Sequence, residues 1–414
     1  MARREESSRG PGPNPEGGAT PSPNPLASAE QKSQFPTAVV DLLQRNRRGC
    51  MTVRASRFAM RSPGNTGSTS TPPPSAWVSI ARVHDYDPSC VLDGMRRCLE
   101  PLGGMEAVVR PGQHVLLKPN LLGGFPPHRA VTTHPSVVRA AILLVQEAGG
   151  IPWVGDSPAM GDLDSVIGNC GLAPVLRETG AQILDCSKAA SFAVPDHKLV
   201  SKVELASALR QVDIVITLPK LKTHGQMTLT AALKNQYGLI PGALKSQWHF
   251  RLQEAEWLAA LLLDIHRVVR PALAILDAIV AMEGPGPTSG TPRPLGALLA
   301  GSDLVAVDRV ACELIGQDPV NVPLLKAARQ QGLGQADLAR ITMLGDEWHS
   351  LVQPDFQRIE RPVDVLRLLP LPAPALRWIQ RHWTLQPRIL EGRCTRCGIC
   401  EEGCPVRLCH PPAC

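Results

Sequence analysis

The chain has few aromatic residues and no long apolar run. Aromatic side chains make up 4% of its 414 residues, whereas hydrophobic residues make up 43%. The core must therefore consist mainly of Leu, Val, Ile and Ala. No stretch of about 18 apolar residues is present, so no transmembrane segment is expected. The charged N-terminus has no apolar run behind it, which argues against a secretory signal. We therefore expect a cytoplasmic protein.

The part of the chain expected to fold has no large excess of charge. The net charge is +6, but residues 1–62 hold ten Lys and Arg against five Asp and Glu, which leaves the remainder close to neutral. We therefore expect no nucleic-acid partner. Residues 1–75 are rich in Pro, Gly, Ser and Thr, a composition that cannot build a packed core, and they are predicted to be a disordered tail.

Between residues 76 and 360, apolar strands alternate with amphipathic helices. Strands are predicted at 77–84, 114–120, 151–158, 181–186, 212–220, 272–280 and 341–346, and helices at 88–104, 134–150, 166–180, 254–269 and 303–316. Continuous Val, Ile and Leu strands separated by helices are typical of a parallel sheet buried on both faces. The sequence predicts an α/β domain with a mainly parallel sheet and helices on both faces. A small ferredoxin-like iron–sulfur segment is predicted at the C-terminus.

Residues 361–390 are apolar, basic and repeatedly broken by proline. We interpret them as a linker, because the prolines prevent one long amphipathic helix. The alternative is a segment that docks on a membrane surface or a partner. The linker leads into the cysteine-rich residues 391–414.

Polar residues gather where the predicted strands end. In an open parallel sheet the carboxyl ends of the strands line the ligand crevice. Four strands should bring lysines, carboxylates and a histidine to one rim: Lys118, Asn120, Asp156, Ser157, Lys220, Lys222, His224, Asp277 and Glu283. The alternative at each position is an ordinary polar residue in the loop that follows a strand. Together they predict a binding site.

The rim residues suggest an anionic ligand. Lys118, Lys220, Lys222 and Lys234 are candidates for binding phosphate or carboxylate, or are surface lysines. The remaining candidates also keep two interpretations. Asp156 would hold a metal or a ribose hydroxyl, or form a local turn before proline, and His224 would act as acid–base or be structural. Thr133 or His134 would cap a helix, and the N-terminus of that helix would either hold an anion or only be capped. Asp303 and Asp308 open a later helix and would supply its cap and a first-turn charge.

Six of the twelve cysteines lie in the last 21 residues. Cys394, Cys397, Cys400 and Cys404, followed by Pro405, match the C-x2-C-x2-C-x3-C-P run that binds a 4Fe-4S cluster. A zinc site is the alternative, although zinc sites usually show two separated C-x2-C pairs. No second run follows, so at most one cluster is expected. The fourth ligand is Cys404, Cys409, Cys414 or a group from outside the chain.

The other cysteines are scattered along the chain. They are predicted to be reduced core thiols, because no signal peptide indicates an oxidising compartment. These residues are Cys50, Cys90, Cys98, Cys170, Cys186 and Cys312.

Several motifs together resemble the "domain of unknown function 362" family over about residues 78–360. They are VLLKPNLL, VTTHPSVVRAAILLVQEAG, VGDSPAMG, PKLKTHGQMTLTAALKNQYGLIPG and DAIVAMEGPGPTSGTP. Members often carry a C-terminal ferredoxin-type domain with two cluster runs, of which this sequence has the first. The resemblance implies an iron–sulfur protein and supplies no substrate. By motif it points to Lys118, Asn120, His134, Asp156, Lys220, Lys222, His224, Lys234, Asn235, Asp277, Glu283 and Asp308.

These observations predict a 4Fe-4S cluster-binding protein that exchanges electrons with an anionic ligand at the strand ends. Such a protein would be an iron–sulfur oxidoreductase with a redox partner protein. The alternative is a non-redox enzyme or binding protein for a phosphorylated or carboxylate metabolite, with a structural cluster.

Overall fold

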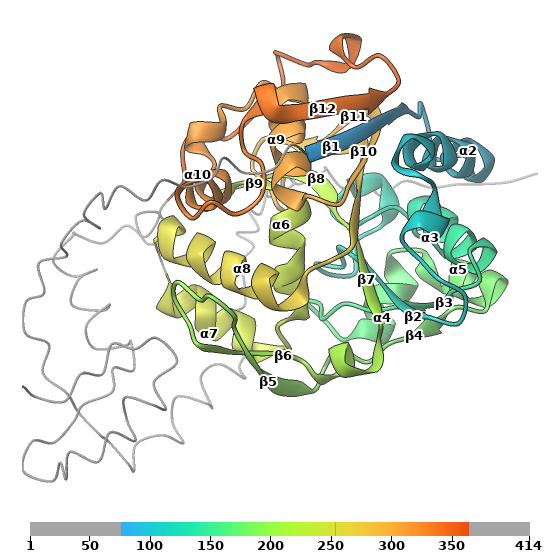
Figure 1. Ribbon diagram of the computed structural model, residues 1–414, viewed down its shortest axis with the longest axis horizontal. Helices are drawn as coiled ribbons and strands as arrows, with labels where there is room; N and C mark the ends of the chain where they lie inside the picture. The colour runs from blue at the N-terminus through green and yellow to red at the C-terminus, as the bar shows by residue number, and fades with distance from the viewer. Residues whose placement is uncertain (1–75, 253, 364–414) are drawn as a thin grey trace, which may run out of the picture. The chain divides into compact units, whose positions relative to one another are not determined.

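The computed structural model describes residues 76–252 and 254–363. The predicted tail and the cysteine run therefore lie outside the described residues, as does nearly all of the predicted linker. Within the described part, a large mixed sheet carries helices on both faces (Figure 1). Its strands follow the order β12 (Ile341–Gly345), β1 (Ala76–Arg82), β11 (Thr291–Gly301), β10 (Leu273–Glu283), β7 (Ile214–Leu218), β2 (His114–Pro119), β3 (Ile151–Val154) and β4 (Gln182–Ile183).

The strands from β10 to β4 are parallel, as predicted. Strand β11 was not predicted, and it runs antiparallel to both β10 and β1. Its sequence, TPRPLGALLAG, does not indicate a strand, because proline and glycine are unfavourable inside strands. Residues 284–290 join β10 to β11 as a hairpin.

One predicted strand is divided at Pro219, which has no N–H to donate to a ladder. Strand β7 ends at Leu218, and β8 (Lys220–His224) continues beside β10 before turning back as β9 (Thr228–Thr230). Two shorter strands, β5 (Ala189–Ala193) and β6 (Lys202–Ala206), form a separate antiparallel pair.

The helices form two layers, which bury alternate residues of the strands. On one face lie α2 (Pro88–Leu99), α3 (Pro135–Glu147), α4 (Leu163–Asn169) and α5 (Leu172–Thr179). On the other lie α6 (Ala232–Asn235), α7 (Ala243–Arg251), α8 (Ala255–Val269), α9 (Leu304–Leu314) and α10 (Pro323–Gln330). Within β2, Val115 and Leu117 pack in the first layer and Leu116 in the second, as the two-residue period of a strand requires. Among the described helices, none has the length and apolar character needed to cross a bilayer.

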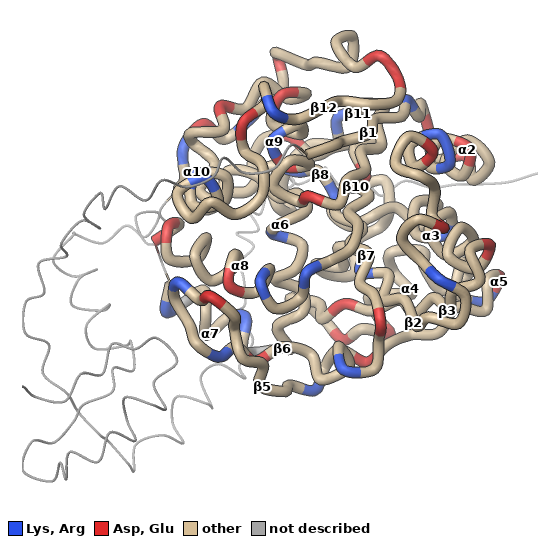
Figure 2. Tube along the Cα trace, viewed as in Figure 1, with Lys and Arg blue, Asp and Glu red and all other residues tan. Residues whose placement is uncertain are grey.

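Both basic and acidic residues lie on the outer helices α2 and α5 (Figure 2). The carboxyl ends of β2 and β3 point toward the segment that carries α6 and α7. The functional candidates gather in that region.

Candidate functional site

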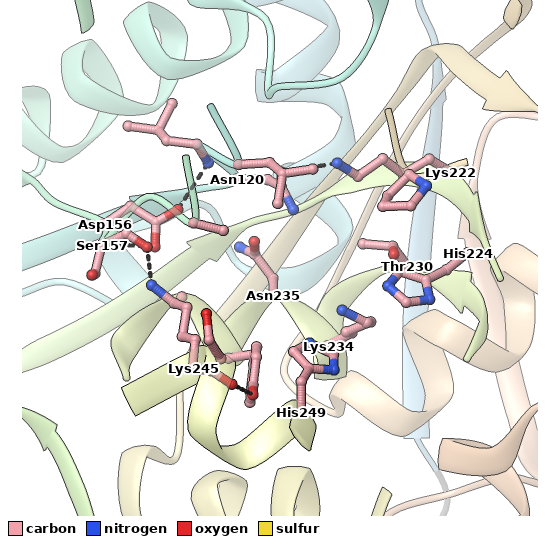
Figure 3. A pocket seen from close by; sticks show the side chains of 17 residues that line it. Asn120, Asp156, Ser157, Lys222, His224, Thr230, Lys234, Asn235, Lys245 and His249 are labelled. Carbon is pink, nitrogen blue, oxygen red and sulfur yellow. Dashed lines mark hydrogen bonds between the residues drawn. The ribbon is translucent and has the colours of Figure 1, made fainter. Parts of the chain in front are cut away.

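A cavity of about 220 Å³ opens where β2 and β3 end, with β8, β9, α6 and α7 around it (Figure 3). Seven predicted residues line it: Asn120, Asp156, Ser157, Lys222, His224, Lys234 and Asn235. The first five follow or lie on β2, β3 and β8, as the strand-end prediction has it, whereas the last two come from helix α6. Lys118 lies just behind the wall, whereas His134, Lys220, Asp277 and Glu283 lie elsewhere.

Lys118 and Asp156 form a buried ion pair beside the cavity. Nζ of Lys118 lies 2.8 Å from Oδ1 of Asp156, and the two side chains are 0% and 5% exposed. The amides of Leu121 and Ser157 also donate to the Asp156 carboxylate, at 2.8 and 3.0 Å. Gly238 is a necessary neighbour, because a Cβ there would overlap both charged groups. The carboxylate of Asp156 was a candidate for binding a metal or a ribose hydroxyl. In the structure it already has Lys118 and two backbone amides as partners.

Three further lysines place ammonium groups at this cavity. Lys222, 1% exposed, donates to the carbonyl of Val131 at 2.6 Å and to Oδ1 of Asn120 at 3.1 Å. Lys245 donates to the carbonyl oxygen of Ser157. Lys234 has no hydrogen bond or ion pair within the described residues, and its Nζ lies 5.6 Å from the centre of the Tyr237 ring.

The cavity is therefore electropositive. Among its described lining residues the only carboxylate is Asp156, which Lys118 already neutralises. Burial lowers the pKa of Lys234 to about 8. Burial likewise lowers the pKa of Lys245 to about 8, although Asp156 partly opposes the shift. Burial, and then the nearby charges of Lys234 and Lys220, hold the pKa of Lys222 well below its ordinary value.

Two histidines lie beside Lys234. Burial first, and then the Lys234 charge, lower the pKa of His249 to about 4. The same causes, together with His249 and Lys222, hold the pKa of His224 well below 6.5. Nδ1 of His224 accepts the amide N–H of Met227 at 3.2 Å, so the neutral ring carries its proton on Nε2 and can donate there.

The remaining rim residues form a second buried cluster around Tyr86. Lys220 donates to Oδ2 of Asp277 at 2.9 Å and to the Tyr86 hydroxyl at 2.6 Å. Tyr86 donates to Oδ1 of Asp277 at 2.8 Å, and its ring stacks on His134 with centroids 3.6 Å apart. His134 caps α3, as one sequence interpretation had it, by accepting the Ser136 amide at Nδ1. These groups do not line the cavity. The residues predicted to share one rim therefore form two separate clusters.

Two carboxylates stand apart from both clusters. Glu283 ends β10 and accepts the amide N–H of Gln357 at 2.9 Å. This hydrogen bond holds the segment around Gln357 against the end of β10. Asp308, predicted to be a first-turn charge, is 2% exposed and accepts the amides of Ala232 and Leu233 at 2.6 and 3.2 Å. That prediction was wrong, because Asp308 caps α6, the short helix that carries Lys234. Asp303 caps its own helix, α9, as predicted.

The cysteines within the described residues are free thiols. Cys98, Cys170, Cys186 and Cys312 are buried, as predicted for core thiols, but Cys90 is exposed. Among these described residues no group of three or more His, Cys, Asp or Glu side chains could hold a metal ion. The predicted cluster ligands Cys394, Cys397, Cys400 and Cys404 lie outside the described residues. The spacing of Cys394, Cys397 and Cys400 would suit a 4Fe-4S cluster, whose fourth ligand would be Cys404 or one of the alternatives given above.

Several site residues escaped the sequence interpretation. Thr230, Tyr237, Lys245 and His249 line the cavity, and Tyr86 organises the second cluster. The only local signal was the four-residue spacing of Lys245 and His249, which places both on one face of α7. None of these residues follows a strand of the central parallel sheet directly.

Comparison with known proteins gives a family and one well-matched relative. Residues 115–313 match the family described as "Domain of unknown function (DUF362)". The "Thylakoid-associated protein sll1697" of Synechocystis sp. is 40% identical over 257 residues, which are 62% of this chain and 79% of that protein.

Solved structures are more distant. The lactate racemase apoprotein from Thermoanaerobacterium thermosaccharolyticum gives a TM-score of 0.39 at 9% identity, covering 62% of this chain and 60% of that one. A Thermotoga maritima protein gives 0.35 at 11% identity, covering 55% and 58%. The chain therefore spans about 60% of the length of these solved chains. From the family match and the identity to the cyanobacterial relative, the chain belongs to the DUF362 family.

Proposed function

We propose that this protein binds a small anionic molecule in the cavity and links it to electron transfer through a 4Fe-4S cluster held by the C-terminal cysteines. One observation carries the binding half of the proposal. Lys222, Lys234 and Lys245 reach the cavity from β8, α6 and α7, and its one lining carboxylate among the described residues is already paired.

Electrostatics explain why an anion would bind. Removing an ammonium group from water is costly, and nearby like charges add to that cost. The lowered pKa values of Lys234 and Lys245 are a sign of this cost in the free protein. A bound anion would offset it, and a lysine ammonium suits phosphate or carboxylate.

The redox half rests on the cysteine run. Cys394, Cys397 and Cys400, with Cys404 or another group as the fourth ligand, would hold the cluster. A cluster of this type supplies single-electron transfer. A redox partner protein would then supply or accept the electrons, and the protein would be an iron–sulfur oxidoreductase. The non-redox alternative uses the same lysines and assigns the cluster a structural role.

Ligand binding can be tested by thermal unfolding in the presence of phosphorylated and carboxylated metabolites, with sodium chloride matching the ionic strength. We expect selected anions to raise the unfolding temperature, because ligands that bind only the folded state stabilise it. The variant Lys326→Gln is the control, since Lys326 is an exposed residue of α10. If no anion exceeds the chloride control, the binding proposal fails.

The cluster can be tested on protein purified without oxygen. We expect about four iron and four sulfide per chain and a paramagnetic signal in one redox state. Cys397→Ser should lose most of the iron, whereas Cys90→Ser should keep it. Iron-free protein containing zinc would exclude the cluster. If iron-depleted Cys397→Ser keeps full turnover with an identified substrate, the non-redox alternative holds.

The compartment is also a proposal. Iron–sulfur chemistry with reduced thiols fits the cytoplasm, whereas the name of the Synechocystis relative places that protein at thylakoids. Fractionation of the host cell, followed by detection of this chain in the soluble and membrane fractions, distinguishes the two locations.

A further inference from the structure

The cavity has two chemically different ends (Figure 3). Asp156, Ser157 and Lys245 lie at one end, and Lys222, His224, Thr230, Lys234 and His249 lie toward the other. At the first end, Lys118 and Asp156 balance one another. At the second end, two lysines face no carboxylate among the described cavity residues.

Thr230 provides an independent indication of a ligand at the second end. Its side chain is 3% exposed and lines the cavity, and its hydroxyl has no hydrogen-bond partner within the described residues. Lys222 and Thr230 are direct partners across the β8–β9 hairpin, so their side chains leave the same face. Burying a hydroxyl without a partner is unfavourable, which indicates that a ligand atom completes it.

The donors at this end match a phosphoryl group. Resting on the proposed function, we infer that Lys222, Thr230, Lys234, His224 and His249 form a phosphate subsite, and that the ligand is a phosphorylated small molecule whose other end faces Ser157 and Lys245. A phosphoryl group has three acceptor oxygens and close to two negative charges at pH 7. A carboxylate has two oxygens and one charge, and would leave one ammonium group uncompensated.

The opposite end sets the orientation of the ligand. Lys245 and the neutralised Asp156 offer hydrogen bonds there, but less net positive charge. A hydroxyl or carbonyl group suits these partners better than a second phosphate. The ligand would therefore lie along the cavity, with its phosphate at the β8–β9 hairpin.

Calorimetric titration with inorganic phosphate tests the subsite, with acetate at equal ionic strength as the comparison. Thr230→Val removes the hydroxyl while keeping the shape, and should weaken phosphate binding roughly tenfold or more. It should leave the unfolding temperature of the free protein unchanged or higher. Thr230→Ser retains the hydroxyl and should bind phosphate within about threefold of the wild type.

Each outcome is decisive. If Thr230→Val is folded and binds phosphate as tightly as the wild type, the subsite is wrong, while anion binding by the cavity stands. If the wild type binds acetate but not phosphate, the ligand class is wrong and the proposed function stands. If neither anion binds, the proposed function itself fails. Should Thr230→Val not fold, Lys234→Gln must lose more phosphate affinity than Lys245→Gln for the subsite to survive.

Discussion

Lys118 and Asp156 meet at 2.8 Å with almost no exposure to solvent, next to a glycine that leaves room for nothing larger. This pair decides the charge of the cavity. Because Asp156 is satisfied by Lys118, it does not neutralise Lys222 or Lys234, and an anionic ligand can do so. The pair also anchors the segments that follow β2 and β3, through the amides of Leu121 and Ser157.

Gly238→Ala should damage this pair. The added Cβ would overlap Asp156 and Lys118, so at least one buried charge must move away from its partner. Breaking a buried pair typically costs about 3–5 kcal/mol, and we expect a loss of that order in the free energy of unfolding. Gly168→Ala is the matched control, since its Cβ would meet nothing within 4 Å on the exposed side of α4. For Gly168→Ala we expect the free energy of unfolding to increase by about 0.5–1 kcal/mol. Equal urea midpoints for the two variants would contradict this account.

Anion affinity should depend on pH through the cavity lysines. Burial lowers the pKa of Lys234 and of Lys245 to about 8, so both lose their charge in the free protein as the pH rises above that value. Phosphate is already mostly dianionic at pH 8. Its affinity should therefore be nearly level from pH 7 to 8 and fall by up to about tenfold per pH unit above this range for each lysine involved. Calorimetric titrations from pH 7 to 10 check this, and a constant affinity would argue against lysine involvement.

Asp308 should make stability fall as the pH rises. Burial raises the pKa of this carboxyl from 3.8 to about 7 in the folded protein, despite two amide donors. Between these values the folded state keeps a proton that the unfolded state has lost, so the free energy of unfolding decreases as the pH increases. The total for this group is on the order of 4 kcal/mol. Asp308→Asn lacks this titration, and its urea midpoint should change less than that of the wild type between pH 5 and pH 8. Identical pH profiles would contradict the assignment.

Tyr86→Phe should lower the stability of the protein through the second cluster and leave anion binding in the cavity unchanged. The hydroxyl links Lys220 to Asp277 and also accepts the Val280 amide at 3.1 Å. Its removal leaves buried polar groups short of a partner, so we expect a loss of about 1–3 kcal/mol in the free energy of unfolding. Phosphate affinity should be unchanged, because Tyr86 does not line the cavity. A variant of normal stability that loses phosphate affinity would show that the cluster belongs to the binding site.

The sequence could predict the residues that follow strands, because parallel strands deliver their carboxyl ends to one edge. Lys118, Asp156 and Lys222 lie in that region for this reason. The sequence could not show that Asp277 pairs with Lys220, since their contact depends on the register of β8 against β10. Because of this register, Lys220 and Asp277 belong to a second cluster outside the cavity. Thr230 and Lys245 reach the cavity through tertiary packing, which strand periodicity does not reveal.

Calorimetric titration of the full chain with inorganic phosphate, beside Lys234→Gln and Lys326→Gln, tests the central claim most directly. Lys234 lines the cavity and has no hydrogen bond or ion pair among the described residues, whereas Lys326 is exposed on α10. The account predicts saturable one-to-one binding that Lys326→Gln keeps and that Lys234→Gln weakens by roughly tenfold or more. Absence of saturable binding to the wild type, or equal affinity in the two variants, would contradict it.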